Sequence, residues 1–165
     1  ALPDDELAIA QSTGQLYRNF QGYSTHAHCD LLAFGVSAIG MVGNTYAQNV
    51  KDLDACYAAI EQNQLPLDRG LTLNQDDLIR RDLITQLICL FELDFTRFDQ
   101  RWQIDSRSYF SDELARLQVK QQDGLLILDD TGIHVRDPGR LLIRSICMEF
   151  DVYLKHTQQR FSRVI

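Results

Sequence analysis

The sequence predicts a mixed α+β fold that is mainly α, and two patterns support this prediction. The second half of the chain contains successive segments with apolar residues at helical spacing, followed by a β-hairpin pattern and a final apolar helix. The first half contains an apolar, glycine-bearing segment, residues 31–42, that is typical of a buried strand. We therefore expect one domain at residues 1–72 and a helical, winged-helix-like domain at residues 73–165.

Composition limits the classes of function. The chain has 165 residues, of which 45% are hydrophobic, so a folded core is expected. The formal net charge of -7 opposes nonspecific attraction to nucleic acid or to an anionic membrane surface. No apolar run approaches the length that spans a bilayer. We expect neither nucleic acid nor membrane as a partner.

The cysteines do not have metal-binding spacing. Cys29, Cys56, Cys89 and Cys147 are far apart in sequence, so no pair resembles a zinc or iron–sulfur motif. They are expected to be buried free thiols of a cytoplasmic protein. The acidic start at Ala1 lacks a secretory signal and an initiator methionine, which favours a fragment of a longer protein.

The first half predicts three elements. Asp4 or Asp5 is expected to cap a helix that runs to about Phe20. Residues 31–42 are expected to form a strand buried on both sides, with sheet neighbours upstream of this chain. An unpaired edge of that strand would promote self-association of the isolated chain. Residues 51–63 are expected to form a short amphipathic helix.

The second half carries stronger signals. Asn74 is a good N-cap for a helix in which Ile79, Leu83, Leu87 and Phe91 recur on one face. The other expected elements are helices at residues 96–102 and from Ser108 or Ser111 to Gln121, a hairpin at residues 124–128 and 133–136, and a long, mostly buried helix from Asp137-Pro138 to Leu154.

Three helices with a hairpin are the elements of a winged-helix domain, whose common use is DNA binding. The helix that would enter the groove carries Asp112, Glu113, Arg116 and Lys120, so its charges cancel. Because fold alone does not set function, DNA binding is not the expected role.

Several polar clusters fit structural roles better than chemistry. His26, His28 and Cys29 contain metal-binding side chains, but alternation along a strand would point Cys29 away from the histidines. A polar loop is the simpler interpretation. The carboxylate pairs fit helix caps or turns, and the two later histidines fit structural positions: Asp76-Asp77, Asp129-Asp130, His134 and His156.

Residues around Gln21 and Ile39 resemble a ligand-facing edge. Gln21 lies in a turn, where its amide offers both a donor and an acceptor to an amino-acid or ribose group. Ile39 lies between Gly35 and Gly40, which let a ligand approach the backbone. Spacing alone still favours structural roles. The same holds for arginines that could pair with substrate carboxylates: Arg18, Arg80, Arg81, Arg140, Arg144 and Arg163.

Several motifs in the same order resemble the carboxyl-terminal part of the bacterial oxygen-independent coproporphyrinogen III oxidase (dehydrogenase) family. They are Arg18-Asn19-Phe20-Gln21-Gly22-Tyr23, Gly35-Val36-Ser37-Ala38-Ile39, Tyr46-Ala47-Gln48-Asn49, Arg80-Arg81-Asp82, Arg140-Leu141-Leu142-Ile143-Arg144 and Phe161-Ser162-Arg163-Val164-Ile165. The resemblance extends from Ala1 to Ile165.

The resemblance implies a radical S-adenosylmethionine enzyme of heme biosynthesis, which converts two propionates of coproporphyrinogen III to vinyl groups. Residues 1–72 would then be the end of the radical-SAM α/β barrel. The position of Ile39 implies contact with S-adenosylmethionine, and that of Gln21 implies a second, polar contact. The three-cysteine motif that holds the 4Fe-4S cluster is absent from this chain, so the chain alone is expected to be inactive and to need the upstream radical-SAM domain.

Two alternatives remain open. Heme-chaperone relatives share the radical fold but lack the Asn19-Phe20-Gln21-Gly22-Tyr23 turn found here. A free-standing winged-helix interaction module would not present an unpaired apolar strand, and the 31–42 segment therefore argues against it.

Overall fold

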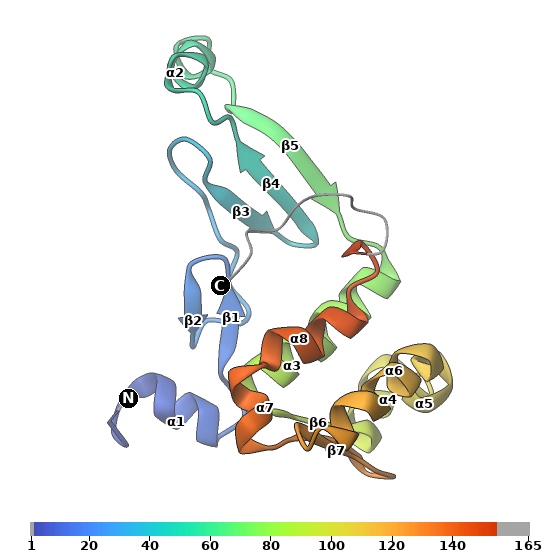
Figure 1. Ribbon diagram of the computed structural model, residues 1–165. Helices are drawn as coiled ribbons and strands as arrows, with labels where there is room; N and C mark the ends of the chain where they lie inside the picture. The colour runs from blue at the N-terminus through green and yellow to red at the C-terminus, as the bar shows by residue number, and fades with distance from the viewer. Residues whose placement is uncertain (1, 155–165) are drawn as a thin grey trace.

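The computed structural model describes residues 2–154 (Figure 1). Residues 17–72 form a β-rich arm, and residues 73–154 form a helical body. The elements of the first half are α1 (Glu6–Ser12), β1 (Tyr17–Asn19), β2 (Gly22–Ser24), β3 (Ile39–Val42), β4 (Thr45–Asn49), α2 (Leu53–Glu61) and β5 (Leu67–Thr72). The elements of the second half are α3 (Gln75–Leu90), β6 (Glu92–Asp94), α4 (Phe95–Trp102), α5 (Ser106–Tyr109), α6 (Ser111–Gln122), β7 (Leu126–Leu128), β8 (Gly132–Val135), α7 (Asp137–Leu141), α8 (Ile143–Cys147) and the 3₁₀ helix η1 (Met148–Phe150). The predicted α+β class, mainly α, is confirmed.

Helix α1 is shorter than predicted. Asp5 caps it, because its carboxylate accepts a hydrogen bond of 2.9 Å from the backbone N–H of Leu7. The helix ends at Ser12, and Gly14 follows with a φ of 72°, in the left-handed region that a helix cannot continue through. The expected extension to Phe20 is therefore wrong, and the antiparallel hairpin β1–β2 occupies this stretch instead.

The prediction of a doubly buried strand at residues 31–42 is also wrong. The segment is irregular as far as β3, apart from one antiparallel bridge between Leu31 and Met41, and the Phe34 side chain is 87% exposed. Strand β3 pairs with β4, and β4 with β5, all antiparallel, so the neighbours lie downstream. The side-chain amide of the buried Asn49 holds the irregular part by donating to the Gly35 carbonyl at 2.8 Å.

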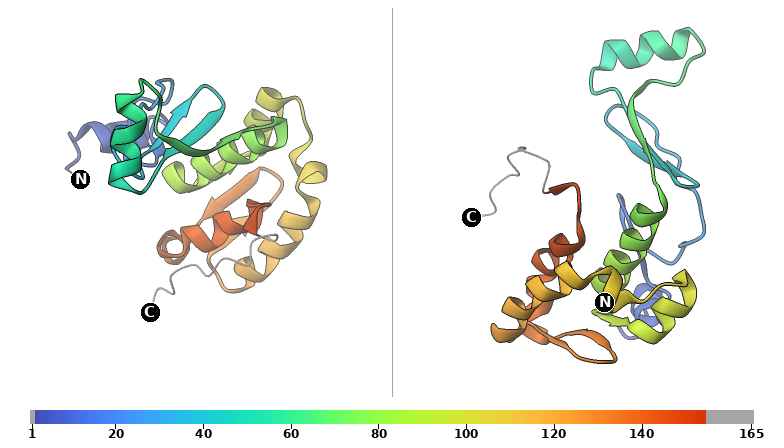
Figure 2. Two further views of the ribbon diagram at one scale, coloured as in Figure 1. Left: turned by 90° about the horizontal axis from the view of Figure 1, so that it is seen from above. Right: turned by 90° about the vertical axis from the view of Figure 1, so that its right-hand side faces the viewer.

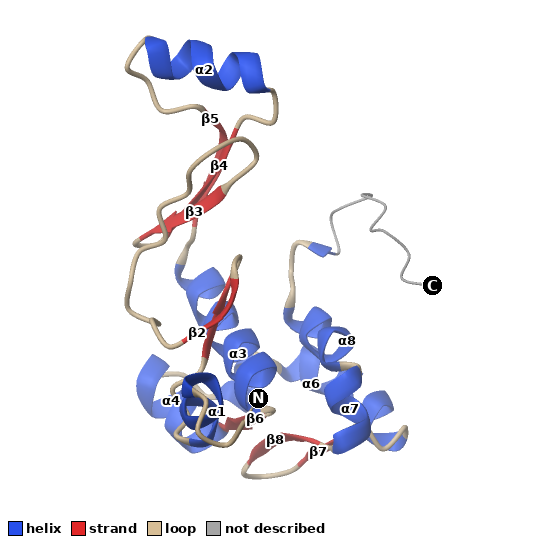
Figure 3. Cartoon of the chain, turned by 90° about the vertical axis from the view of Figure 1, so that its left-hand side faces the viewer, coloured by secondary structure: helices blue, strands red, loops and turns tan. Residues whose placement is uncertain are grey.

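Strands β4 and β5 extend away from the helical body, and α2 connects their far ends (Figures 1 and 3). Asp52 caps α2 by accepting from the Ala55 N–H, so the predicted helix is confirmed. Its apolar face does not meet the body: Leu53, Tyr57 and Ile60 are 55%, 57% and 53% exposed.

Helix α3 supports both parts of the molecule. The predicted N-cap is confirmed as a full capping box, in which Asn74 accepts from the Asp77 N–H and Asp77 accepts from the Asn74 N–H, both at 2.9 Å. The apolar face of α3 packs into the main core of the helical body. That core consists of Ile79, Leu83, Leu87, Leu93, Phe95, Phe98, Phe110, Leu117, Leu126, Ile133, Val135, Ile146, Cys147 and Phe150.

The predicted hairpin is confirmed as β7 and β8, but the sheet has a third strand that the sequence patterns did not predict. Strand β6 pairs with β8, giving the order β6-β8-β7, and this small sheet closes one end of the helical body (Figure 2). The helices predicted at residues 96–102 and near Ser111 are α4 and α6, with the short α5 between them.

The predicted long final helix is wrong. It is divided into α7, α8 and η1, because Leu142 leaves helical geometry with a φ of -108° and a ψ of 17°. The break leaves Leu141 90% exposed while it directs Ile146 and Phe150 into the core. His156 and the terminal motif at residues 161–165 lie outside the described residues. None of the helices within residues 2–154 combines the length and hydropathy that a bilayer crossing requires.

Candidate functional site

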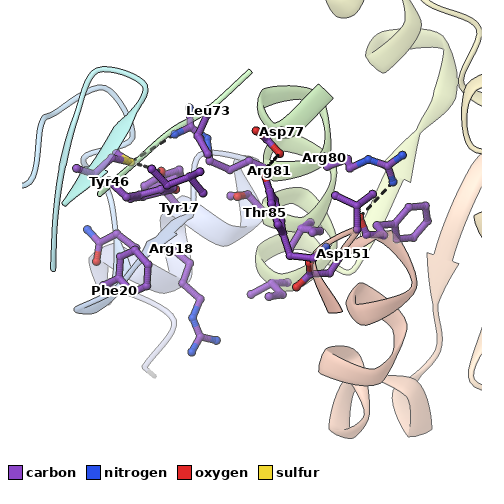
Figure 4. Close-up of a pocket in the computed structure, with 18 of the residues that line it drawn as sticks. Tyr17, Arg18, Phe20, Tyr46, Leu73, Asp77, Arg80, Arg81, Thr85 and Asp151 are labelled. Atoms are coloured by element: carbon purple, nitrogen blue, oxygen red, sulfur yellow. Dashed lines mark hydrogen bonds between the residues drawn. The ribbon is translucent and has the colours of Figure 1, made fainter. Parts of the chain in front are cut away.

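A cavity of about 850 Å³ lies between the β-rich arm and α3 (Figure 4). One wall is formed by the β1–β2 hairpin and by β3, β4 and β5, and the opposite wall by α3 and the segment around Phe150. This volume lies within the usual range for small-molecule sites.

The arm side of the cavity is aromatic and apolar. The rings of Phe20 and Tyr46 meet edge to face, with centroids 5.4 Å apart, so the hairpin tip packs on the sheet. The hydroxyl of Tyr17 lies 4.0 Å from the sulfur of Met41, which is the cross-strand partner of Tyr46. Burial, and then the neighbouring Tyr46, raise the pKa of Tyr17, which keeps its hydroxyl neutral.

The consecutive arginines of α3 have different surroundings. Arg80 is engaged by protein groups: its guanidinium contacts Asp76 at 2.8 Å, Glu113 at 3.2 Å and the Phe150 carbonyl at 3.2 Å. Arg81 extends toward the arm, where its Nη1 lies 3.4 Å from the Met41 sulfur (Figure 4). No carboxylate within residues 2–154 lies in ion-pair distance of Arg81.

Two acidic residues that line the cavity have structural partners. Asp77 belongs to the capping box and also accepts a hydrogen bond of 2.8 Å from the Tyr153 hydroxyl. Asp151 accepts from the Tyr153 N–H at 2.9 Å. The predicted cap role is confirmed for Asp77, whereas Asp76 lies in the first turn of α3 and its carboxylate accepts from Arg80 and from the Tyr109 hydroxyl. The predicted turn role is confirmed for Asp129, which accepts from the Thr131 and Gly132 N–H groups.

Gln21 and Ile39 are not among the lining residues of this cavity, although Phe20 and Met41, close to them in sequence, are. Gln21 follows Phe20 at the exposed tip of the β1–β2 hairpin, where its backbone N–H donates to the Asn19 side chain at 2.9 Å. Its side-chain amide makes no hydrogen bond to residues 2–154. Ile39 is half-buried on β3, two residues from Met41, so alternation places both on one face of the sheet.

The described residues do not fit a metal cluster. Within residues 2–154, no three His, Cys, Asp or Glu side chains are arranged to hold a metal ion. His26, His28 and Cys29 are all exposed in a loop, so the expectation of a buried thiol is wrong for Cys29. It is confirmed for Cys56, Cys89 and Cys147. A 4Fe-4S cluster would therefore need ligands from elsewhere.

The sequence patterns did not identify Tyr17 and Arg81, which give the cavity an aromatic wall and a positive charge. These patterns place Tyr17 in a helix and Arg81 among several arginines that fit a helix surface. The signal that could have found Arg81 is its spacing from Asp77 and Thr85, four residues on either side, because residues at this spacing share one face of a helix. That face lines the cavity.

Comparison with known proteins gives relatives over the whole chain. Residues 73–142 match the HemN C-terminal domain family. Proteins named oxygen-independent coproporphyrinogen III oxidase are 52% identical in Pseudomonas aeruginosa and 50% identical in Escherichia coli, in both cases over 100% of this chain. The chain spans about a third of these relatives, 36% of each.

A solved structure shares the fold. The coproporphyrinogen III oxidase (HemN) of Escherichia coli, described as a radical SAM enzyme, superposes with a TM-score of 0.89 and 50% identity. The match covers 93% of this chain and 35% of that one. Residues 73–142 thus match the HemN C-terminal domain family, and the chain is similar over its whole length to oxygen-independent coproporphyrinogen III oxidases.

Proposed function

We propose that this chain acts as the carboxyl-terminal part of an oxygen-independent coproporphyrinogen III oxidase. The whole enzyme would decarboxylate two propionates of coproporphyrinogen III oxidatively to vinyl groups and release protoporphyrinogen IX. The observation that carries this proposal is the match of the entire chain to such an oxidase at 52% identity. The shared fold, with a TM-score of 0.89, supports it.

We propose that this chain contributes to cofactor binding and that an upstream radical-SAM domain supplies the cluster ligands. S-adenosylmethionine, when bound with a 4Fe-4S cluster, supplies the radical that removes a substrate hydrogen. Gln21 fits a polar contact to it, because its amide is exposed and makes no hydrogen bond to residues 2–154. Ile39 fits an apolar contact, because it is half-buried on the sheet face that carries Met41.

The two parts of the chain have different proposed roles. Residues 1–72 form the edge of the catalytic domain, and residues 73–165 cover it and exclude water from a reactive intermediate. The start of the family match at residue 73 supports this boundary. Because the described residues do not fit a metal cluster, we expect the chain alone to have no activity.

The test is anaerobic turnover of coproporphyrinogen III by the full-length protein, reconstituted with iron and sulfide. We expect vinyl product from the parent and at least a tenfold loss in Gln21→Ala, roughly the value of one lost polar contact. A loss of at least the same size is expected in Ile39→Asp, because a carboxylate would replace an apolar contact. Gln64→Ala and Val42→Asp are matched controls, because both side chains are exposed and neither lines the cavity. Absence of product from a parent with a formed cluster would contradict the proposal.

A further inference from the structure

Three arginines that line the cavity form no ion pair with a carboxylate of residues 2–154. Eleven arginines lie within residues 2–154, and six of them have a carboxylate within 4.0 Å: Arg80, Arg97, Arg101, Arg107, Arg116 and Arg140. Of the remaining five described arginines, three line this one cavity, namely Arg18, Arg81 and Arg144. The lining also contains Asp77 and Asp151, which form no ion pair within residues 2–154, so the unpaired arginines exceed the unpaired carboxylates by one. In a chain of net charge -7, this locally positive lining favours an anionic ligand.

Arg81 is the best placed of the three. Its side chain is partly buried between α3 and the arm. Within residues 2–154 its guanidinium donates to the Met41 sulfur, which is only a weak hydrogen-bond acceptor. A partly desolvated guanidinium that lacks a counterion gains more from a ligand carboxylate than a fully solvated one does. Arg18 lies across the cavity on β1, half-buried, with its guanidinium 5.1 Å from the centre of the Tyr23 ring.

The rest of the cavity suits a large apolar body between these charges. Phe20 and Tyr46 form an aromatic surface on the arm, and Ile84 and Ile88 present aliphatic side chains from α3. The acidic side chains of the lining are already hydrogen-bonded, as Asp77 is to Tyr153. A ligand that combines an apolar ring system with peripheral carboxylates matches both features.

We propose that Arg81, together with Arg18, binds propionate carboxylates of the tetrapyrrole substrate. This inference rests on the proposed function and makes this cavity part of the substrate site. The shared chemistry is a carboxylate, which the methionyl group of S-adenosylmethionine also carries, so the two sources must be separated experimentally.

The test uses the full-length protein, reconstituted anaerobically, and coproporphyrin III as an unreactive tetracarboxylate probe followed by fluorescence. We expect the dissociation constant to rise about ten- to a hundredfold in Arg81→Gln and in Arg18→Gln, the usual value of a charge-assisted pair. Arg81→Lys should recover part of the loss, because it keeps the charge without the bidentate fork. Arg97→Gln is the matched control, since Arg97 is exposed on α4 and does not line the cavity.

The tetramethyl ester of the same porphyrin separates charge recognition from shape. The parent and Arg81→Gln should bind this ester with equal affinity. The inference is overturned if Arg81→Gln binds coproporphyrin III within about twofold of Arg97→Gln, if the ester is weakened to the same extent, or if only the affinity for S-adenosylmethionine changes. Turnover by the parent separates the two proposals: conversion with unchanged binding in the variants refutes this inference alone, whereas a parent that binds the porphyrin through Arg81 but forms no vinyl product refutes the proposed activity.

Discussion

The guanidinium of Arg80 and the carboxylate of Glu113 form an ion pair of 3.2 Å that joins α3 to α6. Both side chains are largely buried, at 13% and 9% exposure, and Arg80 also contacts Asp76 and the Phe150 carbonyl. The pair therefore fixes three parts of the helical body, while the neighbouring Arg81 remains available to the cavity.

Removal of the Arg80 charge should destabilise the fold. In Arg80→Gln, Glu113 keeps only the longer contact to Arg116 at 3.6 Å, so its buried carboxylate loses its main partner. We expect a loss of about 2–4 kcal/mol in the free energy of unfolding, measured by urea denaturation. Arg97→Gln is the control, because its ion pair at 3.7 Å involves an exposed side chain and should contribute below about 1 kcal/mol. Equal midpoints for the two variants would refute the assigned role.

The capping box at the start of α3 gives a second prediction. Asn74→Ala removes the acceptor of the Asp77 N–H, and we expect about 1 kcal/mol lower stability. Asn74→Ser keeps a side-chain acceptor at the N-cap and should recover most of this loss in the same denaturation experiment. If serine and alanine were equally destabilising, the hydrogen bond would not be the cause.

The thiols should differ sharply in reactivity. Burial raises the pKa of Cys89 to about 11 and that of Cys147 to about 12, and Cys56 is also buried, whereas Cys29 is exposed. Iodoacetamide at pH 8 should therefore modify the native chain once, at Cys29, as mass spectrometry of the peptides would show. The Cys29→Ser variant should remain unlabelled until urea is added. Fast labelling of Cys147 in the native state would contradict the described core.

The same thiols predict a loss of stability in alkali. The folded pKa values of Cys89 and Cys147 are raised above the ordinary thiol value of 9.0, so the unfolded chain loses these two protons at a lower pH than the folded chain does. Their contribution is fully present below about pH 9 and is lost progressively as the pH rises toward 11–12. Urea midpoints measured between pH 8 and 10.5 should fall, and Cys147→Ala should show a smaller fall from its own starting value. An equally steep fall in that variant would assign the effect to other groups.

The exposed apolar face of α2 predicts that the isolated chain binds a hydrophobic dye. Leu53, Tyr57 and Ile60 are about half exposed at the far end of the arm, and a hydrophobic dye should bind there. We expect Leu53→Gln with Ile60→Gln to reduce dye fluorescence while the unfolding midpoint of the helical body stays unchanged. Leu141→Gln is a matched control, since Leu141 is exposed on α7, away from the arm. Unchanged fluorescence in the double variant would exclude α2 as the binding surface.

The sequence predicted the helical body better than the arm, for physical reasons. In the helical body, the Asn74 N-cap and the helical spacing of Ile79, Leu83 and Leu87 depend only on residues close in sequence. The structure confirms both. The β-hairpin was predictable for the same reason. Strand β6 was not, because its three residues gain strand character only from pairing with β8, distant in sequence.

The arm shows where local reasoning fails. Residues 31–42 are apolar, yet much of the segment remains outside any described core, so composition alone indicated burial that packing does not provide. The S-adenosylmethionine contacts of Gln21 and Ile39 rest on a family resemblance and stay predictions. The cavity itself was not predictable, since it forms only when the hairpin, the three-stranded sheet and α3 meet.

Helix α3 belongs to two structures at once, because one of its faces enters the core through Leu83 and Leu87 while the other lines the cavity through Arg81 and Ile84. Ligand affinity and resistance to unfolding are then thermodynamically linked. A molecule held at a hundred times its dissociation constant would add about 2.7 kcal/mol to the stability of the folded state. Amide hydrogens on the core side of α3 would exchange more slowly in its presence, although no ligand atom touches them.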